Sequence, residues 1–222
     1  MAEGTDFFKY IHPRIEKLIK DKMNEDGIEF DGEIYTWDNI RRPLSSNNYC
    51  VYQTENLYLD HKRTPHYIRF LNGAKYVFDY SMKNIPYYPR GIYLPLKLET
   101  IPEKNNIINN EILFYGYLSD RRNNLINLLR QNNISIKTVD GHFGEKLFNL
   151  LSQYQYILSY GTYDNFSNDS FRVLPAIENG CTVFFERTEE TEFDEYLLKR
   201  CPDRIIPFEE KNIIDVINRH IK

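Results

Sequence analysis

Short apolar runs alternate with amphipathic stretches along the chain, and the alternation predicts strands and helices in turn. An apolar residue every three or four positions predicts a helix over residues 5–23, which either begins near Pro13 or is kinked there. A second helix is predicted to start at Thr64-Pro65, since proline is favoured in the first helical turn. The extended segments predicted in this half are 33–37, 49–52, 75–80 and 91–98.

The second half repeats the alternation more regularly. It predicts strands at 112–115, 135–139, 156–159 and 181–186. Helices are predicted between them at 121–131, at 145–153 and from Ser170 to Asn179-Gly180. Such an order is typical of right-handed βαβ units and a doubly wound parallel sheet, so the predicted fold class is α/β. Residues 99–111 are polar and without an apolar period, which predicts an amino-terminal domain over 1–100 and a carboxy-terminal domain over 111–222.

Composition and charge exclude several classes of protein. The formal net charge of the 222 residues is −4, which gives no electrostatic case for nucleic acid as a partner. No apolar run approaches the roughly 20 residues of a membrane helix, and the first six residues do not resemble a signal peptide. Three widely spaced cysteines are typical of buried thiols in a reducing compartment. We therefore expect a cytoplasmic protein, in the host cytoplasm if the chain is viral.

The strongest chemical signal comes from loops that follow predicted strands. Parallel sheets bind ligands beyond the carboxyl ends of their strands, where loops 116–122, 140–144 and 161–170 are expected. Gly116 would let a phosphate approach the backbone, and Arg121 and Arg122 at the start of the next helix would neutralise it. The alternative is a solvated first turn, although a cation at a helix amino terminus opposes the helix dipole.

The helix after loop 161–170 carries the second arginine candidate. Ser170 or Asp169 is expected to cap this helix, and its amino terminus would attract an anion. Arg172 interrupts the apolar side of the helix, so it needs either a bound anion or an internal partner, for which Glu178 is the candidate. The planar guanidinium fork of an arginine can grip a diphosphate.

Other polar residues give weaker signals. Glu55 follows the predicted strand 49–52 and is read either as a functional carboxylate or as a helix cap. His142 is either an ordinary loop histidine or a ligand-binding one. His61 and His66 have no carboxylate at ligand spacing, and the loops offer no Asp-x-Asp pair, so no metal and no cofactor is predicted.

Several segments, taken in order, resemble a group of bacterial and viral glycosyltransferases. YQTENL (52–57), YIRFL (67–71), YVFDYSMKN (76–84) and YLPL (93–96) resemble the amino-terminal domain of that group. ILFYGYLSDRRNNLINLL (112–129) and SFRVLPAIENGCTVFFE (170–186) resemble its carboxy-terminal, donor-binding domain and spore-coat glycosyltransferase-like proteins. Two departures are Asn56, where the box usually has glutamine, and Pro175, where many members have glutamate.

The resemblance implies two Rossmann-like domains in a compact GT-B-like arrangement that face each other across a cleft. The activity it implies is metal-independent transfer of a sugar from a nucleotide-diphosphate donor, held by the second domain, to an acceptor. Glu55 would then be the catalytic base if the enzyme inverts, and Glu178 would lie near the ribose or support Arg172. The donor-binding set would be Gly116, Arg121, Arg122, His142, Ser170, Arg172 and Glu178.

The expected partners are a UDP- or GDP-sugar and a glycan or other small acceptor. Two further hypotheses stay open: a nucleotide-sugar or glycan-binding protein that kept the fold without catalysis, and a structural partner whose cleft another chain fills.

Overall fold

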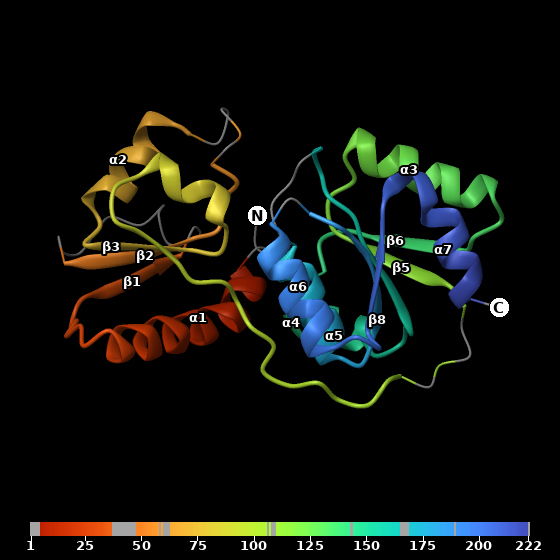
Figure 1. Cartoon of the computed structure of the whole chain (residues 1–222), viewed down its shortest axis with the longest axis horizontal. Coiled ribbons are helices and arrows are strands. Elements are labelled where there is room, and N and C mark those ends of the chain that lie inside the picture. The colour runs from red at the N-terminus through yellow and green to blue at the C-terminus, as the bar shows by residue number, and fades with distance from the viewer. Residues whose placement is uncertain are drawn as a thin grey trace. The chain divides into compact units, whose positions relative to one another are not determined.

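A computed structural model describes residues 5–36, 48–57, 59, 63–105, 107, 110–142, 144–164, 169–188 and 190–221, with the backbone alone for residues 5–10. Trp37, the predicted loop residues 41–47, His61 and residues 165–168 of the third predicted loop lie outside these ranges. The chain divides into two compact units, Met1–Leu96 and Lys97–Lys222, and each is a parallel α/β structure (Figure 1). The α/β prediction is therefore confirmed.

The first unit contains a four-stranded parallel sheet with the order β1-β2-β3-β4. Its elements are α1 (Thr5–Glu25), β1 (Glu33–Thr36), β2 (Tyr49–Gln53), α2 (Pro65–Gly73), β3 (Tyr76–Asp79), the 3-10 helix η3 (Met82–Tyr87) and β4 (Gly91–Tyr93). Helix α1 begins ahead of Pro13 and buries Ile11, Ile15 and Ile19 at a spacing of four residues. Strand β4 ends earlier than predicted, two residues before Pro95, which has no N–H for a sheet ladder.

The second unit contains a five-stranded parallel sheet with the order β6-β5-β7-β8-β9. The strands are β5 (Ile112–Tyr115), β6 (Ile136–Val139), β7 (Tyr156–Ser159), β8 (Thr182–Glu186) and β9 (Ile205–Phe208). The helices are α3 (Asp120–Gln131), α4 (Gly144–Leu151), α5 (Ser170–Glu178), α6 (Thr191–Arg200), η4 (Glu210–Asn212) and α7 (Ile213–His220).

Helices cover both faces of this second sheet. Figure 1 shows α3 and α7 on one face and α4, α5 and α6 on the other. On the α3 and α7 face, Phe114, Leu158 and Phe184 of three neighbouring strands pack with Leu129 and Ile217 in one buried cluster. The central strands β5, β7 and β8 are almost entirely buried, as expected for a parallel sheet between two helical layers, whereas the edge strand β6 exposes Lys137.

The chain changes direction across this sheet between β5 and β7. From β5 it moves outward to β6 and then returns to β7 on the other side of β5. Helices α3 and α5, which follow β5 and β7, consequently lie on opposite faces (Figure 1). The loops after β5 and β7 diverge at the carboxyl ends of the strands, and this switch point is where open α/β sheets bind ligands.

The polar segment between the two halves packs on the opposite, amino edge of the second sheet. The backbone N–H of Asn105 donates to the Gly180 carbonyl at 2.9 Å, and its side-chain amide donates to the Tyr154 carbonyl at 3.1 Å. Arg204 donates to the Gly180 carbonyl at 2.6 Å and also to that of Pro102. These bonds tie the segment to the second unit, at the end of the sheet away from the switch point.

Candidate functional site

Gly116 directly follows β5 and begins the loop at the site. Its φ is +120°, a conformation that residues with a Cβ rarely adopt. A Cβ built on Gly116 would also stand only 2.9 Å from Nη2 of Arg172. The positive φ therefore favours glycine here, and the short distance shows that the tip of Arg172, from the first turn of α5, lies against this backbone.

Arg172 lies across the carboxyl end of β5. Its Nε donates to the Tyr115 carbonyl at 2.9 Å, and its Cζ is 5.3 Å from the centre of the Phe114 ring. Its carboxylate partner is Asp169, whose Oδ2 also accepts a 2.6 Å hydrogen bond from Ser159. The internal partner is thus three residues before Arg172, and it is not Glu178 as the sequence suggested.

Arg122 is the most buried arginine of the site, with 5% of its surface exposed. Its Nε donates to the Tyr160 carbonyl at 2.9 Å and its Nη1 to the Tyr117 carbonyl at 2.8 Å, so the side chain spans the β5 and β7 loops. It forms no ion pair with any described residue. Burial, and next the charge of Arg172, lower the pKa of Arg122 to about 9.

Together the two arginines form a cationic pair over one ring. The Cζ of Arg122 is 5.2 Å from the Phe114 centroid, almost the distance found for Arg172. Asp169 forms an ion pair with Arg172, while Arg122 feels the charges of Asp169 and Glu186 without forming an ion pair with either carboxylate. In the described part of the chain, Nη2 of each arginine makes no hydrogen bond. Each arginine therefore keeps N–H donors for an incoming anion, both of those on Nη2 among them.

Arg121 has a different environment although it is the next residue. Its five N–H donors are all occupied: two bond Glu186 at 2.5 and 3.1 Å, and the others bond Asp164, Glu210 and the Gly161 carbonyl at 2.7–3.0 Å. The guanidinium also stacks on the Tyr160 ring at 3.9 Å. Its pKa is raised by Glu186 in spite of partial burial. This geometry leaves Arg121 no donor for a phosphate, so we assign it a structural role.

The other residues predicted to bind the donor substrate do not all lie together in the structure. Ser170 is the buried first residue of α5, and Asp169 holds the cap position without a side-chain capping bond. Glu178 is at the far end of α5, about 9 Å along the helix from Arg172, and accepts a 2.8 Å hydrogen bond from the Glu99 N–H. His142 follows β6, and its Nδ1 is 3.1 Å from the Asp140 carbonyl. The structure thus groups Gly116, Arg122 and Arg172, and Ser170 precedes Arg172 by two residues on α5.

Glu55 occupies the carboxyl edge of the sheet in the first unit. Its carbonyl accepts hydrogen bonds from Gln53 Nε2 at 2.6 Å and Asn84 Nδ2 at 2.8 Å, and its N–H donates to the Gln53 side chain. The side chain is half-buried. Its backbone is therefore held by residues from β2 and from the 3-10 helix after β3.

A buried carboxylate next to this loop was missed by the sequence reasoning. Asp79 ends β3 with no exposed surface and accepts hydrogen bonds from Gln53, Asn84, Tyr88 and the Ser81 N–H. Burial raises its pKa to about 7 in spite of these bonds. The signal was available, because Gln53 and Asp79 are polar residues at the ends of two apolar strands.

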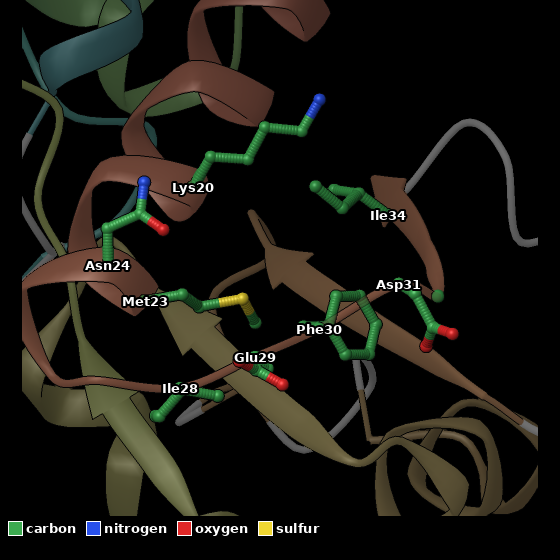
Figure 2. A pocket seen from close by; sticks show the side chains of 9 residues that line it. Lys20, Met23, Asn24, Ile28, Glu29, Phe30, Asp31 and Ile34 are labelled. Atoms are coloured by element: carbon green, nitrogen blue, oxygen red, sulfur yellow. The ribbon is translucent and has the colours of Figure 1, made fainter.

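A separate pocket of about 620 Å³ lies in the first unit between α1 and β1. Figure 2 shows the apolar side chains of Met23, Ile28, Phe30 and Ile34 in its wall and the amine of Lys20 at its rim. It contains none of the residues that the sequence singled out. Among the residues described, no three His, Cys, Asp or Glu side chains are grouped so that they could hold a metal ion.

The fold and this site define a parallel α/β protein with a cationic pair at the switch point of its second sheet. Comparison with protein families, curated proteins and solved structures found no match to this chain. Over the described ranges, no helix has the length and apolar character needed to cross a membrane.

Proposed function

We propose that the second unit binds the diphosphate of a nucleotide sugar and that the chain is a metal-independent glycosyltransferase of the GT-B type. The observation that carries the proposal is the pair formed by Arg122 and Arg172 beside Gly116, at the switch point where such sheets bind ligands. A buried arginine without a carboxylate partner is costly to the fold. A bound anion would supply the missing charge.

The chemistry required of this pair is the stabilisation of a leaving group. In glycosyl transfer the bond between the sugar anomeric carbon and the diphosphate oxygen breaks, and the electron pair stays on the diphosphate. Negative charge on that oxygen therefore grows toward the transition state, where cationic donors act most strongly. Two guanidinium groups and the amino terminus of α5 can take the part that a metal ion plays elsewhere.

The acceptor hydroxyl must lose its proton as its oxygen bonds the anomeric carbon. For an inverting reaction, we assign this proton to the Glu55 carboxylate, which follows the carboxyl end of β2. The hydrogen bonds to the Glu55 backbone from Gln53 and Asn84 support this assignment, since a general base must be held in place.

The direct test is a thermal-shift titration with UDP-, GDP-, CMP- and dTDP-sugars, with and without EDTA. Binding at 100 times Kd adds about 2.7 kcal/mol to the free energy of unfolding, which corresponds to a Tm rise of roughly 5–10 °C. Arg122→Met should lose the shift. Arg130→Met is the matched control because Arg130 is exposed on the same helix.

Three outcomes separate the hypotheses. Binding of one donor together with its slow hydrolysis supports the transferase. Binding of a donor without hydrolysis supports a catalytically inactive binding protein. No shift with any of the four nucleotide classes at millimolar concentration removes the proposal. If EDTA abolished transfer and magnesium or manganese restored it, the metal-independent account of the diphosphate would be wrong.

A further inference from the structure

Two exposed tyrosines belong to the loops that follow β5 and β7. Large apolar side chains are seldom exposed among the described residues, and those that are comprise Met82, Tyr117, Leu128 and Tyr163. Tyr117 is 66% exposed and belongs to the loop after β5, and Tyr163 is 38% exposed and belongs to the loop after β7. Both tyrosines therefore lie on the two loops that diverge at the switch point.

The backbones that carry these rings are fixed to the site. Arg122 donates to the Tyr117 carbonyl itself at 2.8 Å. The two loops are joined where Ser119 donates to the carbonyl of Thr162, the residue before Tyr163, at 3.2 Å. The backbone of Tyr117 is therefore held by Arg122, and the backbone next to Tyr163 is held by the loop that carries Tyr117. The exposed ring surface of Tyr117 meets water at a cost that stacking on a ligand would remove.

We propose that Tyr117, assisted by Tyr163, forms the platform on which the heterocyclic base of the bound nucleotide stacks. The inference rests on the proposed function, because it assigns to Arg122 and Arg172 the diphosphate of the same ligand. One ribose separates the base of a nucleotide from its diphosphate, so the platform must be adjacent to the arginine pair. Tyr117 meets this requirement through its bond to Arg122. A tyrosine face accepts any base, so the platform provides affinity for nucleotides without choosing among them.

The test compares nucleoside diphosphates with inorganic pyrophosphate by calorimetric titration. Tyr117→Ala should weaken UDP and GDP binding by about 5- to 150-fold, the range for loss of one base–aromatic stack. Pyrophosphate binding should stay unchanged in the same variant, because it has no base. Tyr117→Phe should bind UDP and GDP like the wild type, since it keeps the ring. Leu128→Ala is the control for removing an exposed apolar side chain from this unit.

The outcomes separate this inference from the proposed function. If the wild type binds UDP and GDP no better than pyrophosphate, or if Tyr117→Ala leaves their affinities unchanged, the platform is wrong while the arginine site stands. Equal weakening of nucleotide and pyrophosphate binding in Tyr117→Ala would also overturn it, because the tyrosine would then act through Arg122. Failure of every diphosphate to bind the wild type would remove both.

Discussion

Arg121 and Arg122 are adjacent, yet replacement by methionine should destabilise the fold much more at Arg121 than at Arg122. Arg121 neutralises Glu186, whose side chain is only 10% exposed and whose pKa is raised by burial even with the arginine in place. Arg121→Met would leave this carboxylate buried with the Gly161 N–H as its described donor. Breaking a buried pair from one side costs about 3–5 kcal/mol. Asp164 and Glu210 add little because they are exposed.

Arg122→Met has two effects on the free energy of unfolding that oppose each other. It removes the hydrogen bonds to the Tyr160 and Tyr117 carbonyls, and each loss lowers the free energy of unfolding by about 1.5–3 kcal/mol because the donor is charged. It also removes a buried charge that faces Arg172 and has no carboxylate of its own, and this relief offsets much of the loss. Methionine can still pack against the Phe114 ring. We expect a net change within about 2 kcal/mol.

Urea denaturation followed by circular dichroism measures both variants against the wild type. The loss of unfolding free energy in Arg121→Met, relative to the wild type, should be smaller at pH 5 than at pH 8. With the arginine gone, the folded pKa of Glu186 lies further above its unfolded value, so stability falls as the pH rises through that interval. If Arg122→Met lost as much stability as Arg121→Met, then Arg122 would be a structural residue and the reasoning that assigns it to a ligand would be refuted.

Three further predictions concern the other residues of the two units. Arg172→Ala should weaken donor binding and lower kcat/KM by an amount equivalent to about 2–4 kcal/mol of transition-state stabilisation. Glu55→Gln should keep the donor affinity and lower kcat by roughly 10²–10⁴-fold. If steady-state kinetics showed equal losses of donor affinity in both variants, this division of roles would be refuted. Gly116→Ala should lower the free energy of unfolding, measured in urea, by about 1–3 kcal/mol and should also weaken diphosphate binding. Gly27 is the control, because its φ is +67° and a Cβ there meets nothing within 4 Å. Gly27→Ala should leave diphosphate binding unchanged. Because burial raises the folded pKa of Asp79 to about 7, stability should fall by about 2–4 kcal/mol between pH 4 and pH 7. Asp79→Asn should remove that part of the slope, and a variant with the wild-type slope would show that another group is responsible.

Sequence pattern predicted most of the strands and helices because each buried strand is a short apolar run. It also predicted Gly116 and Arg172 at one sheet edge, since parallel strands place their exit loops together. The pattern could not separate Arg121 from Arg122. Successive helical residues point about 100° apart, so the two side chains have different surroundings. The carboxylates that bond Arg121 belong to Glu186 and Glu210, which are far from it in the sequence.

The partner of Arg172 was predictable and was nevertheless missed. Asp169 is three residues before it, a spacing at which helical side chains meet, whereas Glu178 is six residues away and toward the other end of the helix. The polar network around Asp79 needed the order of β2 and β3 as well as the sequence. Gln53 and Asp79 meet only because those strands are neighbours in register.

Calorimetric titration of UDP and GDP into the wild type, Arg122→Met and Arg130→Met tests the central claim most directly. If Arg122 and Arg172 form a diphosphate site, the wild type and Arg130→Met should bind at least one of these nucleotides with equal affinity. Arg122→Met, still folded by circular dichroism, should bind it at least about tenfold more weakly, as expected for loss of a charge-assisted hydrogen bond. Unchanged binding by folded Arg122→Met would contradict the claim.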